Sequence, residues 1–281
     1  MKITKAIITA AAPDQGNLPL QQLVDNTGQN KSALQLIIEE ALQAGIEDIC
    51  VVIRPGDGGA FEQAAGPHAS RLTYVEQTDP RGYGDALMRA REFAADQPFL
   101  HLVGDHLYLS NTDRCCAAQL VSVAEKEECS VSAVQATRES KLPLFGTVGG
   151  QPVPQRSDLY EVSKVLEKPT PTLAEQELIV AGLRSGYYLC FFGMHVLTPT
   201  TMDLLDDAVK KAEPSRSIQL SNSLSALAQR ERYLALEVKG TRYNIGEKYG
   251  LLIAQLALAL IGDDRDQILT ELVELLATRN Q

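Results

Sequence analysis

Apolar and polar positions along the first 110 residues predict strands and helices in alternation. Ile3–Ala11 is an almost unbroken apolar run, which is typical of a strand covered on both faces. Between Ser32 and Gly45, apolar residues recur at helical spacing, which predicts a helix with one buried face. Ser32 and Gln35 form a capping-box pattern at its start, and Gly45 marks its end.

The same alternation continues beyond this first unit. We predict strands at Ile49–Ile53, Leu72–Glu76 and Phe99–Val103, with a helix at about Asp85–Ala94. Repeated strand–helix units predict a parallel sheet between layers of helices. Pro55–Gly59, which is rich in glycine, is interpreted as a flexible turn.

The pattern is looser after residue 110. A helix near Thr112–Glu127 precedes further predicted strands at 130–137, 160–166, 187–192 and 233–238. Thr198 and Pro199 form the cap and the first residue expected of another helix. Two helices, near 247–261 and 266–278, close the chain. The apolar stretch Leu251–Ile261 could be core or a subunit contact, and we interpret it as core. The prediction is an α/β fold with a Rossmann-like, mixed and mostly parallel sheet flanked by helices.

Composition and charge argue against some classes of function. The chain has 281 residues and a net charge of −10, which argues against a general nucleic-acid binder, because such binding needs a basic face. It has no apolar run of about 18 residues, so we expect no membrane span. The first segment, with Lys2 and Lys5, fits a strand better than a signal peptide, and we expect a cytoplasmic protein. The five cysteines form no CxxC pair and are predicted to be buried thiols.

Polar residues follow several predicted strands, at the end where open α/β sheets bind ligands. In the segment His101–His106 an apolar strand ends in Gly104-Asp105, and the carboxylate of Asp105 suits Mg²⁺ as well as it suits a turn cap. Gln77 and Gly82–Asp85 join a strand to a helix. The amide of Gln77 could read a base edge, and the glycines let backbone approach a ligand, although a lone Gly-x-Gly is more often an ordinary turn.

Two later segments have the same placement. In Glu167-Lys168-Pro169 the carboxylate can accept from sugar hydroxyls while the ammonium meets a phosphate, although such a tripeptide is usually a solvated loop. Asn244–Gly250 also joins a strand to a helix. The four histidines show no metal spacing, and His106 is a candidate only for supporting Asp105.

In their order and spacing these segments resemble the bacterial UTP–glucose-1-phosphate uridylyltransferases, within the sugar nucleotidyltransferase superfamily. The resemblance covers nearly the whole chain and also includes Lys5–Ala11, Lys31, Leu144-Phe145-Gly146 and Ser217–Leu220. It implies a fold of the nucleotide-diphospho-sugar transferase type and a single domain over residues 1–281. In that domain, residues 1–110 form the nucleotide-binding half, and residues 111–281 form the sugar-binding half with the C-terminal helices.

The resemblance also implies roles for residues. The nucleotide is expected to bind Ala11, Ala12, Gln77, Gly82, Gly84 and Asp85. The sugar phosphate is expected to bind Phe145, Gly146, Glu167 and Lys168. Asp105 and Lys168 are the expected catalytic residues, and Mg²⁺ is expected on Asp105 and, weakly, on Asn244. The implied reaction is attack of a sugar-1-phosphate oxygen on the α-phosphorus of a nucleoside triphosphate, which needs no covalent nucleophile from the protein. Whether the chain forms a homo-oligomer is left open.

Two departures from the family pattern concern the phosphates. The family's first loop reads G-x-G-T-R, whereas Ala12-Pro13-Asp14-Gln15-Gly16 stands here, so the arginine that grips the triphosphate is replaced by Gly16. The stretch Leu20–Asn30 has no lysine or arginine. Asn244 replaces the second metal-binding aspartate, and Arg242 adds a cation nearby.

These departures leave alternatives beside the leading hypothesis, which is transfer of UMP from UTP to glucose-1-phosphate. One alternative is a catalytically impaired relative that binds a nucleotide or nucleotide sugar as a sensor or partner subunit, because binding tolerates such losses better than transfer does. A dinucleotide-dependent oxidoreductase would need a G-x-G-x-x-G turn after the first strand, which Ala10–Gly16 lacks.

Overall fold

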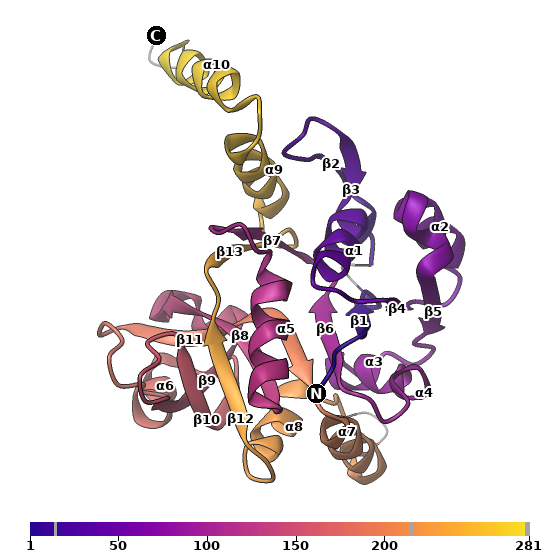
Figure 1. Ribbon diagram of the computed structural model, residues 1–281, viewed down its shortest axis with the longest axis vertical. Helices are drawn as coiled ribbons and strands as arrows, with labels where there is room; N and C mark the ends of the chain where they lie inside the picture. Colours follow the sequence, from indigo (N-terminus) through magenta and orange to yellow (C-terminus); the bar gives the residue numbers. More distant parts are fainter. Residues whose placement is uncertain (14–15, 214–215, 279–281) are drawn as a thin grey trace.

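A nine-stranded sheet with helices on both faces forms the centre of the computed structural model, which describes residues 1–13, 16–213 and 216–278 (Figure 1). The strand order is β5-β4-β1-β6-β11-β8-β12-β10-β9. The first four strands are parallel to one another, as the strand–helix alternation predicts: β5 (Leu72–Glu76), β4 (Asp48–Ile53), β1 (Lys5–Thr9) and β6 (Phe99–Val103).

The second half of the sheet is mixed. Strand β11 (Tyr187–Leu197) runs antiparallel to both β6 and β8 (Ser130–Arg138), and β12 (Tyr233–Glu237) is parallel to β8. Strands β10 (Leu159–Glu167) and β9 (Gly146–Pro152) complete the edge in antiparallel pairing. The predicted mixed α/β fold is therefore confirmed, with the antiparallel pairs confined to the part of the sheet beyond β6.

Two apolar clusters, one on each face of the sheet, form the main core. Strand β1 shows how they arise: Ala6 and Ile8 belong to one cluster and Ile7 to the other, because successive side chains point to opposite faces. The first cluster packs under α1 (Ala33–Gln43), α2 (Gly58–Ala65) and α5 (Cys116–Glu127). The second packs under α3 (Tyr83–Arg89), α4 (Arg91–Ala94), α7 (Pro199–Lys211) and α8 (Leu220–Leu227). A smaller third cluster lies under α6 (Pro171–Glu177).

The ends of the helices can be compared directly with the caps and turns predicted from the sequence. The capping box is confirmed, since Ser32 Oγ accepts the N–H of Gln35 at 3.0 Å and Gln35 Oε1 accepts that of Ser32 at 2.9 Å. Thr198 stands at the N-cap of α7 as predicted, but its hydroxyl donates to Glu231 Oε1 at 2.6 Å and forms no cap bond. The interpretation of Pro55–Gly59 as only a turn is wrong, because its two last glycines begin α2.

Several short elements were not predicted from the sequence patterns. Strands β7 (His106–Ser110) and β13 (Gly240–Asn244) form a separate antiparallel ribbon. A hairpin of β2 (Gln22–Val24) and β3 (Asn30–Ser32) follows the 3₁₀ turn η1 (Leu18–Leu20), and two further turns are η2 (Gly66–Arg71) and η3 (Glu139–Leu144). Such strands of three to five residues are too short to show a hydrophobic period.

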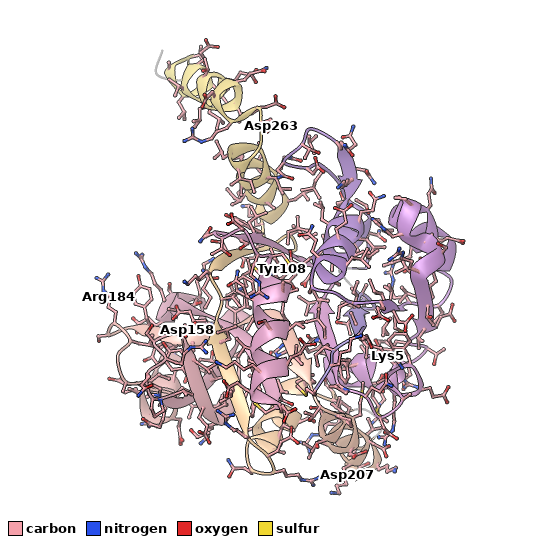
Figure 2. All side chains as sticks on the ribbon, in the orientation of Figure 1. Lys5, Tyr108, Asp158, Arg184, Asp207 and Asp263 are labelled. Atoms are coloured by element: carbon pink, nitrogen blue, oxygen red, sulfur yellow. The ribbon has the colours of Figure 1, made fainter. Side chains whose placement is uncertain are left out.

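The chain closes with two helices, α9 (Gly250–Ile261) and α10 (Arg265–Thr278), which extend away from the sheet (Figure 1). Figure 2 shows Asp263 at the turn between them, outside the body of the molecule. The core interpretation of Leu251–Ile261 is wrong for most of α9, because only Ala254 and Leu258 are buried. Helix α10 has no buried residue and exposes three apolar side chains, Val273, Leu275 and Leu276.

Two further expectations concern membranes and thiols. None of the helices in the described ranges is long and apolar enough to cross a membrane. All five cysteines are free thiols, and four of them are buried, whereas Cys115 is half-buried.

Glu40 joins α1 to the start of α5. Its Oε1 accepts the backbone N–H of Ala117 at 2.7 Å. Burial raises the pKa of the Glu40 carboxyl to about 7, although hydrogen bonds from the start of α5 act in the opposite direction. The carboxyl therefore keeps its proton in the folded chain at a pH where it is ionised in the unfolded chain.

Replacing this carboxyl should change how stability depends on pH. In the unfolded chain Glu40 ionises near 4.5, and in the folded chain near 7. The folded wild type therefore loses stability as the pH rises between these values, because only the unfolded chain gains from ionisation there. Glu40→Gln cannot ionise, so it should gain on the order of 2 kcal/mol relative to wild type between pH 5 and pH 8. Urea unfolding at both pH values measures this, with the exposed Glu62→Gln as control, and an equal pH dependence in wild type and Glu40→Gln contradicts it.

Candidate active site

A cleft of about 410 Å³ opens at the carboxyl ends of β1, β5, β6 and β10, where an open α/β sheet binds ligands. The structure brings seven of the predicted site residues to its wall, namely Ala11, Ala12, Gln77, Gly82, Asp105, Glu167 and Lys168. Five predicted residues do not line it, namely Gly84, Asp85, Phe145, Gly146 and Asn244. Each of these five has a contact that explains its place.

Asp105 follows β6 and lines this cleft. Its Oδ1 is 2.7 Å from His106 Nδ1, and its backbone carbonyl accepts the N–H of Ile245 at 2.9 Å. Burial by itself raises the pKa of Asp105, but the charges of His106 and Lys168 and a hydrogen bond from His106 outweigh it, so the pKa lies below its ordinary value. Asp105 is thus an ionised carboxylate that faces the cleft.

The described residues that line the cleft include two carboxylates, Asp105 and Glu167, and Glu167 is already hydrogen-bonded to Ser221 Oγ, which leaves Asp105 for a divalent cation. Asn244 lies opposite His106 in the β7–β13 ribbon, but its Oδ1 accepts the N–H of Gly246 at 2.8 Å, and it lines a different cavity. The described residues contain no group of three or more histidine, cysteine, aspartate or glutamate side chains placed to hold a metal. One carboxylate with phosphate oxygens and water is a ligand set that Mg²⁺ accepts, so Asp105 fits a cation that arrives with a phosphate ligand.

The amide of Gln77 is oriented by a buried carboxylate. Gln77 Nε2 donates to Asp85 Oδ2 at 2.7 Å and to the carbonyl of Gly82 at 3.2 Å. Asp85 is buried behind Gln77, where it also pairs with Arg89 Nη2 at 3.0 Å. Both N–H groups of Gln77 are therefore used, and Oε1 is left as the hydrogen-bond acceptor that a ligand in the cleft can reach.

The two glycines of the turn after β5 allow close packing against a distant segment. Gly84 donates its N–H to the carbonyl of Ile218 at 2.8 Å, and Ile218 donates to the carbonyl of Arg81 at 2.7 Å. Gly82 has φ +102°, and a Cβ there would collide with Ser217 Oγ. The turn thereby brings Ser217 to the wall of the cleft, a contact that the sequence did not predict.

Glu167 and Lys168 are positioned by the edge of the sheet. The carboxylate of Glu167 hydrogen-bonds Ser221 Oγ, and a Cβ on Gly146 would lie 3.1 Å from Glu167 Oε2. Lys168 has φ 45°, a left-handed conformation that costs a side chain such as lysine about 1–2 kcal/mol. Its N–H donates to the carbonyl of Phe145 at 3.2 Å, which helps to hold it there. Gly146 and Phe145 thus support this pair from behind the cleft wall.

The altered first loop has a cation beside it. Asp14 and Gln15 lie outside the described residues, but a Cβ on Gly16 would lie 2.6 Å from Arg54 Cζ, so the Arg54 guanidinium takes the room of a side chain at position 16. Arg54 follows β4, and it donates to the carbonyl of Pro13 at 3.2 Å. Arg54 is not among the site residues predicted from the sequence, although a cation directly after a parallel strand is a usable signal.

Lys31, a landmark of the family pattern, is not part of this cleft. Its Nζ lies 3.0 Å from Asp25 Oδ2 and 2.7 Å from Glu39 Oε2. The lysine therefore holds the β2–β3 hairpin to α1.

Comparison with known proteins shows the family of this chain. The family model described as Nucleotidyl transferase matches residues 20–254. The chain belongs to this family. A UTP–glucose-1-phosphate uridylyltransferase of Streptococcus pneumoniae serotype 4 is 28% identical to it over 96% of each chain. An enzyme of the same name from Streptococcus pyogenes serotype M3 is 30% identical, over 92% of this chain and 90% of the relative.

Solved structures share the fold of this nucleotidyl transferase. A UDP-glucose pyrophosphorylase complexed with UDP-glucose superposes with a TM-score of 0.75 and 23% identity, over 91% of this chain and 98% of the other. A UTP-bound UGPase from Acinetobacter baumannii superposes with a TM-score of 0.73 and 20% identity, over 96% of this chain and 98% of the other. The predicted fold of the nucleotide-diphospho-sugar transferase type is therefore confirmed.

Proposed function

We propose that this nucleotidyl transferase transfers UMP from UTP to glucose-1-phosphate, giving a nucleotide sugar and pyrophosphate. The observation that carries the proposal is that one cleft gathers a base-reading amide, Gln77, an ionised carboxylate, Asp105, and the pair Glu167 and Lys168. The names of the relatives support the same reaction.

In this proposal each residue has one task. The ammonium of Lys168 holds the sugar phosphate and offsets its charge as it approaches the α-phosphorus. Glu167, held by Ser221, accepts hydrogen bonds from sugar hydroxyls. Asp105 holds Mg²⁺, which when bound supplies positive charge to the phosphates.

Gln77 sets the choice of base. Its free Oε1 is an acceptor, and the N3–H of uracil is a donor, so the two are complementary. Neutral cytosine presents an acceptor at N3 and would face Oε1 with a lone pair. Asp85 prevents the amide from turning over, because a turned amide would place Oε1 against the carboxylate. We therefore expect UTP to be preferred to CTP.

With UTP, glucose-1-phosphate and Mg²⁺ the protein should release pyrophosphate. CTP should give a kcat/KM at least about tenfold lower, the effect of one mismatched hydrogen bond. Asp105→Ala should abolish release, whereas Asp48→Ala, at the opposite end of the sheet, should not. A coupled pyrophosphate assay measures this. Absence of release from a panel of nucleotides and sugar phosphates, with nucleotide-sugar binding intact, would favour the sensor or partner-subunit alternative.

We also propose that Arg54 contacts the β- and γ-phosphates of the nucleotide. Among the described residues that line the cleft, Lys168 is the only lysine or arginine. A triphosphate carries about four negative charges and requires further cations. Arg54 lies against Gly16 and bonds Pro13 at the cleft wall, while its Nε is 2.7 Å from Asp57 Oδ2.

Arg54→Met should raise the KM for UTP by about tenfold or more, because it removes a charge-assisted hydrogen bond. The KM for glucose-1-phosphate should be unchanged. Arg54→Lys should recover part of the loss, since it keeps the charge. Asp57→Asn, which removes the competing carboxylate, should not raise the KM. Steady-state kinetics tests this, and equal effects of Arg54→Met on both substrates would show only a structural role.

We propose further that the exposed apolar side chains of α9 and α10 are covered by a second copy of the chain. Leu252, Ile253, Val273, Leu275 and Leu276 are each more than half exposed, and exposed apolar side chains on two helices in contact favour association.

Light scattering on the purified protein should therefore give the mass of at least two chains, and Leu276→Lys should shift it toward one. Lys210→Leu, on the exposed side of α7, is a control that should leave the mass unchanged. A single-chain mass for the wild type at micromolar concentration contradicts the proposal.

A further inference from the structure

A second cavity, of about 580 Å³, lies beside β13 and collects positive charge. The described residues that line it include four cations and one carboxylate, namely Arg138, Lys141, Arg242, Lys248 and Glu247. The whole chain, by contrast, has a net charge of −10. A hollow whose charge is opposite in sign to that of the rest of the molecule attracts anions. We call it the Arg242 cavity.

The guanidinium of Arg242 has a donor that nothing in the described chain uses. Its Nη1 is buried and has no hydrogen-bond partner among the described residues. Its Cζ lies over the Phe145 ring, 3.9 Å from the ring centre. Burial lowers the pKa of Arg242 to about 10, so the group is still charged at neutral pH. A buried N–H without an acceptor is costly, and a bound anion would remove that cost.

The carboxylate in the Arg242 cavity is already paired with another cation. Glu247 Oε2 lies 3.3 Å from Lys141 Nζ, with which it forms an ion pair. Arg138 donates to a neutral acceptor, the hydroxyl of Tyr187, at 2.9 Å. Four cations less one carboxylate leave the described lining with a surplus of three positive charges. An anion with more than one charge would balance this surplus best.

Arg81 offers a contrast within the same chain. Its Nε is also buried without a partner, but its Nη2 donates to the carbonyl of Glu213 at 3.1 Å. The Arg81 guanidinium is therefore anchored by backbone oxygen. Arg242 has the face of an aromatic ring beside it and open space in the Arg242 cavity.

The Arg242 cavity is separate from the cleft that contains Asp105 and Lys168. No described residue lines both hollows. The chain divides them at two neighbouring residues, since Leu144 lines the cleft and Phe145 lines the cavity. A ligand of the cavity therefore need not compete with the substrates that bind in the cleft.

We propose that the Arg242 cavity is a second ligand site, independent of the cleft, for a phosphate group that is either free or carried by a small polar molecule. A phosphate dianion has two charges and three or more oxygens, so it can meet Arg242 and a neighbouring cation together, whereas a carboxylate has one charge and two oxygens. The guanidinium fork binds two of the phosphate oxygens, and the Phe145 ring fixes its plane.

The size and the neutral lining of the cavity favour a phosphate monoester. Its volume is within the range of about 300–1,000 Å³ that is usual for small-molecule sites, and a bare phosphate ion would fill only a small part of it. Gln135, Thr137 and Ser140 also line the cavity, and their amide and hydroxyl groups can hydrogen-bond the hydroxyls of such a molecule.

Phosphorus NMR titrations at constant ionic strength, without nucleotide or Mg²⁺, test this site. The probes are inorganic phosphate and glycerol 3-phosphate, and the ester should bind more tightly because it fills more of the cavity. Arg242→Met should weaken the binding of both probes at least about tenfold, the effect of one charge-assisted pair. Arg242→Lys, which keeps the charge without the fork, should give an intermediate dissociation constant. Arg71→Met, which removes an exposed arginine next to the edge strand β5, should keep the wild-type value.

Two further variants keep the test sharp. Lys168→Met removes the cation of the cleft, so it should retain the Arg242-dependent binding of both probes. If Arg242→Met does not fold, the double variant Arg138→Met and Lys248→Met takes its place. This double variant should also weaken binding, because it removes two of the three surplus charges.

Each result decides for or against the site. Tighter binding of glycerol 3-phosphate supports a phosphorylated small molecule as the ligand, and tighter or equal binding of inorganic phosphate supports the free ion. Absence of binding to the wild type, loss of all binding in Lys168→Met, or unchanged binding in a folded Arg242→Met overturns the site. None of these titrations depends on turnover, so the proposed transfer of UMP can fail while the Arg242 site stands.

Discussion

The antiparallel pairing of β6 with β11 is the constraint on which the rest of the structure depends, because it joins the two halves of the sheet. His101 on β6 and His195 on β11 are paired there, with ring centres 5.8 Å apart. Burial lowers the pKa of His195 to about 3 and that of His101 well below its ordinary value, so both rings are neutral. Thr9 lies 3.2 Å from one ring and Ser132 lies 2.6 Å from the other, so strands on both sides satisfy the buried nitrogens.

The pairing of β6 with β11 determines where the site lies. Asp105 follows β6 directly, so it stands between the half of the sheet that supplies Gln77 and the half that supplies Glu167 and Lys168. Tyr83 connects the turn of Gly82 and Gly84 to the same pair of strands, since its hydroxyl lies 3.3 Å from His101 Nδ1 on β6. The cleft is therefore formed by both halves of the chain.

Three cations of this acidic protein are held in constrained positions. Lys168 has a left-handed backbone conformation, Arg54 lies against Gly16, and Arg242 stacks on Phe145 with its buried Nη1 unpaired among the described residues. The first costs stability in the free protein through backbone strain, and the last through a buried N–H group that is left without a hydrogen bond. Costs of this kind are common where a ligand later supplies the missing partner.

The sequence alone determined the periodic elements and the order of the motifs. The strands Leu72–Glu76 and Phe99–Val103 and the cap at Ser32 follow from side-chain alternation and local hydrogen bonding, and these depend only on neighbouring residues. Tertiary structure decided the rest, because contacts between distant segments leave no periodic signal. It placed Asp85 behind Gln77, Arg54 in the space at Gly16, and Asn244 outside the cleft. It also left the buried Nη1 of Arg242 without a hydrogen-bond partner among the described residues, which depends on what packs around it.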